Sequence, residues 1–187
     1  MPRRLTPLLP GNYYHVYNRG NNRQPIFFER ENYLYFLRQV RKYFAGYADI
    51  VAYCLLPNHY HLILHLTCGD LSTQMMALSV SYTRAINKRF HRTGSLFQGQ
   101  FKSILVDRDE YLLHLPGYIH RNPVKADLVK HPQEWEFSSY CDYVGLRNGS
   151  LPKPDIVLSQ VPSREAYRVF VEDAITESAI KHLLTDE

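Results

Sequence analysis

The sequence contains few cysteines and has no long uninterrupted apolar segment. Its three cysteines, Cys54, Cys68 and Cys141, are odd in number and form no CxxC pair. This usage is typical of a reducing cytosol and argues against a disulfide framework. Charge or proline interrupts the apolar runs well before the ~20 residues that a membrane span needs. The N-terminus is too rich in proline, and its apolar part is too short, for a signal peptide.

The sequence also lacks the motifs of several enzyme classes. It has no GxxxxGK[ST] loop, no GxGxxG after a strand and no HExxH helix. The sequence therefore does not indicate an NTP-driven enzyme, a dinucleotide-dependent enzyme or a zincin, because the motifs of these classes are missing. At 187 residues with 45% hydrophobic content, the chain is long enough for one globular domain. We expect this domain to span residues 1–145, with an acidic helical extension at residues 146–187.

Charge is distributed unevenly along the chain. Residues 1–133 contain 17 Lys and Arg against 8 Asp and Glu, whereas residues 134–187 contain 5 against 10. A basic body indicates a polyanionic partner, and nucleic acid is the commonest one. The acidic end is either a solvated tail or a segment that covers the basic surface when no ligand is bound.

The segment Ala52–Leu66 carries the most informative pattern in the chain. Apolar residues precede Pro57, as in a buried strand, and strict alternation follows Asn58. Because side chains two apart on a strand share a face, His59 and His61 should project side by side from a sheet. Two imidazoles at this spacing can hold one divalent metal, although ordinary surface histidines fit the same pattern. Proline–asparagine is not a preferred two-residue turn, so we expect a bulge or a longer loop there.

Hydrophobic periodicity predicts the order strand, helix, strand, strand, helix, strand, helix. This order is typical of an α+β, ferredoxin-like (split βαβ) fold, in which an antiparallel sheet of four to five strands carries helices mainly on one face. Two further short helices are expected in the C-terminal extension. The expected strands are 12–18, 50–56, 59–66 and 101–106, and the expected helices are 29–44, 71–90, 107–122, 163–173 and 176–184.

The third expected helix carries a second chemical pattern. Tyr118 and Asn122 are four residues apart, so they lie on one helix face, one turn from each other. There Asn122 could complete the ligand set of a metal held by the histidine pair, with Tyr118 as a nucleophile. The simpler alternatives are a core tyrosine and an asparagine that ends the helix before Pro123. Pro116 either starts this helix or, with Gly117, forms a hinge.

Basic and aromatic side chains are candidates for DNA contact. Three basic residues spaced four apart on the second helix form a stripe, which is also what a solvated helix face looks like. Tyr13, Tyr17 and Phe97 could stack on unpaired bases or close the core. Phosphate contacts would make binding strongly salt-dependent. The candidate DNA-binding residues are Arg19, Arg84, Lys88, Arg92, Lys102, Arg121 and Lys125.

Two segments together resemble the single-tyrosine transposases. Residues 57–62 (PNHYHL) look like the His-hydrophobic-His motif of HUH single-strand nucleases. Residues 118–126 (YIHRNPVKA) resemble the tyrosine helix of the IS200-like single-tyrosine transposases. Within that group the chain is most similar to the REP-associated tyrosine transposases, which act on repetitive extragenic palindromes in bacteria. The likeness runs from about residue 13 to residue 145 and includes segments 13–20, 97–103 and 135–140.

The resemblance implies a ferredoxin-like HUH domain with a defined chemistry. His59 and His61 would ligate one Mg²⁺ or Mn²⁺, with Asn122 as the third protein ligand. Tyr118 would attack single-stranded DNA and leave a 5′-phosphotyrosine link and a free 3′-OH.

The resemblance also implies partners and a location. The DNA would carry a hairpin from a REP-like palindrome, and the protein would be a monomer or homodimer in the bacterial cytoplasm, nucleoid-associated and with no membrane partner. Two other function classes stay open. One is a catalytically inactive ferredoxin-like nucleic-acid-binding module, and the other is a metal hydrolase of small phosphoesters that uses water as its nucleophile.

Overall fold

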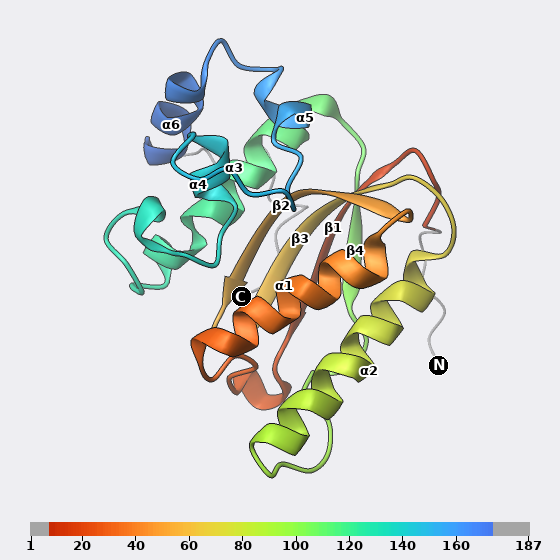
Figure 1. The fold of residues 1–187 in the computed structure, drawn as a ribbon. Helices are drawn as coiled ribbons and strands as arrows, with labels where there is room; N and C mark the ends of the chain where they lie inside the picture. The colour runs from red at the N-terminus through yellow and green to blue at the C-terminus, as the bar shows by residue number, and fades with distance from the viewer. Residues whose placement is uncertain (1–7, 174–187) are drawn as a thin grey trace.

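One four-stranded antiparallel sheet forms the centre of the protein. The computed structural model describes residues 8–173, and the strands lie in the order β2-β3-β1-β4 (Figure 1). This order, with a helix after β1 and another after β3, confirms the ferredoxin-like arrangement. The strands are β1 (Tyr13–Arg19), β2 (Ala48–Leu56), β3 (His59–Leu66) and β4 (Lys102–Val106).

Helices lie on both sides of this sheet. The long helices α1 and α2 pack on one face, and α3 packs on the other, so the expectation of helices mainly on one face describes only α1 and α2 (Figure 1). None of the helices in residues 8–173 is long and apolar enough to span a membrane. The predicted helix at 176–184 lies outside the described residues. The helices are α1 (Arg30–Phe44), α2 (Leu71–Arg89), α3 (Asp109–Lys125), α4 (Tyr140–Tyr143), α5 (Asp155–Leu158) and α6 (Arg164–Glu172), with 3-10 turns at Asn21–Arg23 and Pro132–Glu134.

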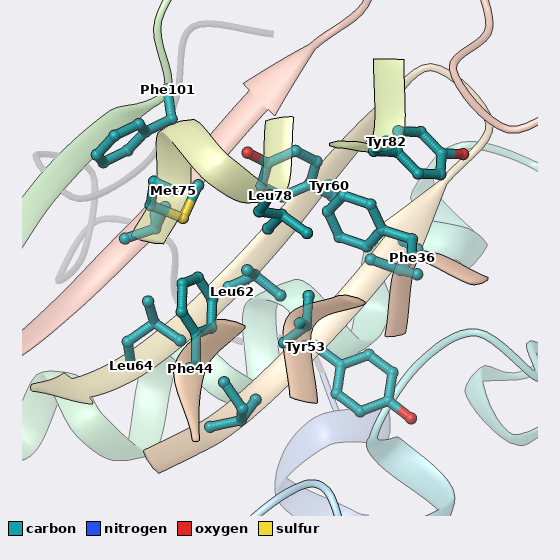
Figure 2. Packing of buried hydrophobic residues seen from close by; sticks show 14 of the residues in the cluster. Phe36, Phe44, Tyr53, Tyr60, Leu62, Leu64, Met75, Leu78, Tyr82 and Phe101 are labelled. Carbon is teal, nitrogen blue, oxygen red and sulfur yellow. The ribbon is translucent and has the colours of Figure 1, made fainter. Parts of the chain in front are cut away.

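The alternation of β3 divides the interior into two clusters. On the side of α1 and α2, which we call the α1/α2 face, every β3 side chain is apolar or aromatic and fully buried. Figure 2 shows Tyr60, Leu62 and Leu64 packed among residues of both helices. Burying each one contributes ~1.5–3 kcal/mol to folding. The β3 residues are Tyr60, Leu62, Leu64 and Leu66, and their helix partners include Phe36, Phe44, Met75 and Leu78.

The opposite side of the sheet, which we call the α3 face, has its own cluster. Cys54 of β2 and Ile63 of β3 are both fully buried there against Tyr118 and Ile119 of α3. Tyr167 of α6 belongs to the same cluster, so the C-terminal helices pack beside α3. The α3 face therefore has a buried core of its own, although His59 and His65 on β3 are only partly buried.

The outer edge of β2 is hydrogen-bonded to residues 135–153. The backbone N–H of Leu55 donates to the Phe137 carbonyl at 2.9 Å, and the N–H of Ser139 donates to the Tyr53 carbonyl at 3.0 Å. Isolated bridges pair the same strand with segments near residues 138 and 152. The edge is therefore occupied by the chain's own later segments.

The connection between β2 and β3 is shorter than expected. It consists only of Pro57 and Asn58, so the prediction of a longer loop or a bulge at this turn is wrong. The turn carbonyls are bound by a distant segment: Gly20 N donates to Asn58 O at 2.7 Å, and Ile26 N donates to Pro57 O at 2.8 Å. These tertiary contacts override a weak local turn preference. The strand irregularity lies instead at residues 50–52.

The start of helix α3 decides between the two interpretations of Pro116, which were a helix start and a hinge with Gly117. It starts at Asp109, so the idea that Pro116 begins the helix is wrong and Pro116 lies in its interior. Asp109 and Glu110 fill the first turn, where negative charge stabilises the helix dipole. Pro116 has no N–H to donate to the Leu112 carbonyl, so the helix lacks one bond just before Tyr118.

Candidate metal and DNA site

A pocket opens where β1 ends and β3 begins. Strand alternation places His59 and His61 on the α3 face, and the cross-strand partner of His61 on β1 is Tyr17. A third segment, residues 98–102, completes the pocket wall. The lining residues are Tyr17, Asn18, Arg19, Arg23, Asn58, His59, Tyr60, His61, Gln98, Gln100 and Lys102.

The two histidines meet edge to face in this pocket. Their ring centroids are 5.0 Å apart with an interplanar angle of 87°. His59 Nδ1 lies 2.6 Å from Asn58 Oδ1, and His61 Nδ1 lies 3.0 Å from His15 Nε2. In both rings the contact within the protein is thus made by Nδ1. The Nε2 atom of His61 is buried and has no hydrogen-bond partner among residues 8–173.

Burial keeps both histidines neutral. Burial, together with a smaller contribution from the positive charge of Arg19, lowers the pKa of His59 to about 4. Burial also lowers the pKa of His61 well below its ordinary value, with smaller contributions from His59 and His15. Neutral imidazole is the form that ligates metals, so the pair is ready to bind at neutral pH without first losing protons.

Helix α3 brings Tyr118 and Asn122 to the same face of the sheet as the histidines. Cys54 is the cross-strand partner of His61, and such partners share a face. Tyr118 packs in one cluster with Cys54. Tyr118 is 4% exposed and Asn122 is 3% exposed, so both are buried, and their four-residue spacing puts them on one face of α3. Among the described residues, however, neither is one of those that line the pocket.

Asn122 is buried with its polar atoms unsatisfied. Neither its Oδ1 nor its Nδ2 has a hydrogen-bond partner within residues 8–173. A buried polar group left in this state costs ~1–3 kcal/mol, which a purely structural role does not explain. The alternative that Asn122 ends the helix is also wrong, because α3 continues to Lys125. Lys125 Nζ lies 4.5 Å from the centroid of the Tyr118 ring.

The residues present fit a divalent metal that is bound by two imidazoles and one amide oxygen. In the described part of the chain, no three His, Cys, Asp or Glu side chains gather as a metal site. The predicted set contains only two such residues, and its third member is an amide. The unsatisfied atoms, His61 Nε2 and Asn122 Oδ1, are the atoms that such a set would use. Nitrogen and oxygen donors suit Mn²⁺, and Mg²⁺ with further oxygens from a phosphate.

The structure separates the seven predicted DNA-binding residues into three groups. One group lines the pocket, and the second lies on α3. The third lies on α2, which covers the opposite face of the sheet, or in the loop that follows it. The first group is therefore the one that lies directly beside the histidine pair. In that order the groups are Arg19 and Lys102; Arg121 and Lys125; and Arg84, Lys88 and Arg92.

Several of these basic side chains already have partners. Arg19 Nε donates to Gln98 Oε1 at the pocket wall, and Lys102 Nζ lies 5.9 Å from the centroid of the Tyr17 ring. Arg121 Nη1 donates to the carbonyl of Asp173 at 2.8 Å. Arg121 is therefore directed towards the end of α6.

The aromatic candidates for base stacking have different surroundings. Phe97 is 5% exposed and packs in the α1/α2 cluster, so it closes the core. Tyr13 stacks on His65 with ring centroids 4.6 Å apart. Tyr17 is the one of the three that lines the pocket.

Sequence reasoning did not identify several residues of this site, among them His15, Asn58, Gln98 and Gln100. A signal for His15 was present, because Tyr14 and Val16 mark the core side of β1 and His15 must then face the other way. Gln98 and Gln100 had no such signal. Their segment reaches the pocket because Gln98 N donates to the Arg19 carbonyl at 2.9 Å.

Comparison with known proteins gives one family match. The family model of IS200-like transposases matches residues 10–122. A Haemophilus influenzae protein described as a REP-associated tyrosine transposase is 29% identical over 103 residues, which cover 49% of this chain and 58% of that protein. The REP-associated tyrosine transposase of Escherichia coli is 29% identical over 94 residues, which cover 49% of this chain and 54% of that protein. The chain thus spans little more than half of either relative.

A solved structure has the same fold. It is a REP-associated tyrosine transposase bound to a REP hairpin, and it superposes with a TM-score of 0.66 over 82% of this chain and 98% of that chain. The two sequences are 21% identical, so this likeness establishes the fold.

Proposed function

This chain belongs to the family of IS200-like transposases, and from that premise we propose that it cleaves and rejoins single-stranded DNA through a covalent link to Tyr118. One observation carries the proposal. Helix α3 places Tyr118 and Asn122 on the sheet face from which His59 and His61 project. A nucleophile and a ligand set on one side of one sheet are what phosphodiester attack requires.

His59, His61 and Asn122 would hold one Mg²⁺ or Mn²⁺. The unsatisfied atoms of His61 and Asn122 support this assignment. When bound, the cation would neutralise charge on the scissile phosphate. Three protein ligands leave positions open for phosphate oxygens, as a catalytic site requires.

The covalent step is a substitution at phosphorus. The Tyr118 Oη–P bond forms as the P–O3′ bond breaks, the phenol proton passes to solvent, and the leaving oxygen takes up a proton to become a 3′-OH. The new tyrosine phosphoester replaces the broken P–O3′ phosphoester, so the number of phosphoester bonds does not change. A 3′-OH can therefore attack it in turn and restore the DNA strand without ATP.

Tyr118 must move to reach a phosphate in the pocket. It is 4% exposed and packs against the sheet. We propose that the movement occurs at Pro116 and Gly117, because Pro116 cannot donate a backbone hydrogen bond to the Leu112 carbonyl and the permissive Gly117 follows it directly. Lys125 lies over the Tyr118 ring and supplies positive charge beside the phenol.

The proposed substrate is single-stranded DNA that carries a REP-like hairpin. The solved relative is bound to a REP hairpin, and the curated relatives are named for the same element. Arg19 and Lys102 would contact the backbone of the strand in the pocket, because they line its wall. Ionic contacts of this kind weaken steeply as salt rises.

A denaturing gel tests the proposal. Single-stranded REP-like hairpins with randomised flanks are incubated with Mn²⁺ and with wild-type protein, Tyr118→Phe or Tyr111→Phe. Tyr111 is a matched control because it is a buried tyrosine on the same helix. We expect a covalent adduct for wild type and Tyr111→Phe and none for Tyr118→Phe.

The same gel separates the two other function classes. Binding without cleavage in any divalent metal would favour the catalytically inactive nucleic-acid-binding module. This module is the second candidate because Tyr118 is buried and does not line the pocket. Turnover without an adduct, unchanged in Tyr118→Phe, would favour a phosphoester hydrolase.

A further inference from the structure

A buried contact between two imidazoles lies behind the pocket. His15 Nε2 of β1 lies 3.0 Å from His61 Nδ1 of β3, and the two rings stack with centroids 5.2 Å apart. His15 is 0% exposed and His61 is 1% exposed, so water does not compete for this contact. A hydrogen bond between two ring nitrogens needs a proton on one and a lone pair on the other. One of the two rings must therefore donate.

The neighbouring histidine shows how such a contact sets a tautomer. Asn58 Nδ2 donates to the Arg23 carbonyl at 3.3 Å, which turns Asn58 Oδ1 towards His59. An amide oxygen can only accept, so His59 Nδ1 must carry the proton. The lone pair of His59 is then on Nε2, the nitrogen that a metal would use.

His61 has two possible arrangements. If His15 donates, a neutral His61 carries its proton on Nε2, which then has no lone pair for a metal and is a buried N–H without an acceptor among the described residues. If His15 accepts, His61 carries its proton on Nδ1 and has a lone pair on Nε2. The second arrangement avoids the buried unsatisfied donor and matches His59.

We infer that His15 is a positioning residue that accepts the proton of His61 Nδ1 and so presents the Nε2 lone pair of His61 to a divalent metal. This inference rests on the proposed metal site. A partner that orients a ligating histidine in this way typically contributes ~10–100-fold in metal affinity.

The tautomer can be measured without metal or DNA. The full chain, labelled with ¹⁵N in its histidines and freed of metal, is examined by long-range ¹H–¹⁵N correlation at pH 8. We expect His61 to show a protonated Nδ1 and an unprotonated Nε2, and His15 to show an unprotonated Nε2. A His61 ring protonated on Nε2 would overturn the inference.

Two variants of His15 test its effect on affinity. Mn²⁺ binding is measured by titration calorimetry for wild type, His15→Leu and His15→Gln, with thermal unfolding to confirm that each is folded. We expect His15→Leu to weaken Mn²⁺ binding by ~10–100-fold. His15→Gln, whose amide oxygen can still accept from Nδ1, should recover most of this loss. The control is His65→Gln on β3, which lies outside the pocket lining and should bind Mn²⁺ as wild type does.

The results distinguish this inference from the proposed function. If the His61 tautomer is as expected but no adduct forms with Tyr118, the nuclease proposal fails and the positioning role stands. If the adduct forms but His61 is protonated on Nε2, the positioning role fails alone. If His15→Leu does not fold, the wild-type tautomer and His15→Gln still decide the question.

Discussion

The two faces of the sheet both carry a buried cluster, but they differ in chemistry and in how completely they are covered. Along β3, the α1/α2 face carries only tyrosine and leucine, whereas the α3 face carries His59, His61, Ile63 and His65. The buried histidines of the described chain, including His15 and His120, all lie on the α3 side. A single alternating strand thus contributes apolar core residues to one face and most of its histidines to the other, so substitutions on β3 can be directed at either face.

A second difference exists within the α3 face. Both ring nitrogens of His120 have partners, with Tyr167 Oη at 2.9 Å and Ser139 Oγ at 2.8 Å. His61 has a partner only at Nδ1. A fully satisfied buried histidine has a structural role, and one with an unsatisfied nitrogen facing a pocket is available for a ligand. The two histidines therefore differ in hydrogen bonding although both are buried.

The largest effect is expected from a substitution on the α3 face. His61→Gln removes one proposed ligand but retains a polar side chain of similar size. Because loss of a ligand's orienting partner already costs ~10–100-fold, we expect adduct formation to fall by at least ~100-fold. The urea midpoint should change little in comparison. Adduct formation at the wild-type rate would contradict the assignment of His61.

The next effect comes from the residue beside it on the other face. Leu62→Ala leaves a cavity in the α1/α2 cluster and should lower the free energy of unfolding by ~2–5 kcal/mol, measured by urea denaturation. The folded fraction should form the adduct at the wild-type rate. Val80→Ala, at an exposed position of α2, is the control and should stay within ~0.5 kcal/mol. A loss of adduct in fully folded Leu62→Ala would show that the two faces are coupled.

Acid should weaken the α3 face first. Burial, with a smaller contribution from the charge of Arg147, lowers the pKa of His120 to about 3. At a pH between this pKa and the ordinary histidine pKa, the unfolded chain therefore binds a proton at His120 that the folded chain does not bind. The stabilisation is complete above pH ~6.5 and falls by up to about 1.4 kcal/mol per pH unit below it. Hydrogen exchange at pH 4.5 should show α3 amides losing protection before those of α1. In His120→Gln the unfolding free energy should fall less steeply over this range.

The smallest expected effect is on the salt dependence of DNA binding, and it distinguishes the basic residues of the pocket from those of α2. Lys102→Gln, at the pocket, should reduce the salt dependence of hairpin binding by about one unit of slope. Lys88→Gln, on α2 over the opposite face, should leave the slope unchanged. Binding titrations at several salt concentrations measure both. Equal losses would indicate that DNA also wraps around α2.

The features that sequence could predict are those that depend on local periodicity. Alternation from His59 to Leu66 was enough to assign the two faces of β3, and the four-residue spacing of Tyr118 and Asn122 was enough to place them on one helix face. These relations hold within a single element, so no tertiary information is needed. The prediction of the ferredoxin-like order followed from the same patterns.

The features that sequence could not predict depend on contacts between distant segments. His15 and His61 are 46 residues apart, and only strand pairing brings them together. The turn at Pro57 is tight because Ile26 binds its carbonyl, which local turn preference does not include. The basic residues of α2 and of the pocket formed one set in the sequence, and only the layer order separates them.

The occupied edge of β2 has a consequence for self-association. β2 has nine residues and is the longest strand, with seven of them buried, and a strand of this kind with open backbone groups is a template for intermolecular β-pairing and fibril growth. Here the carbonyl of Ile50 accepts from Lys153 N at 2.8 Å, and Trp135 Nε1 donates to the Leu55 carbonyl at 2.9 Å. The chain covers its own most aggregation-prone strand, so a foreign strand cannot add at that side.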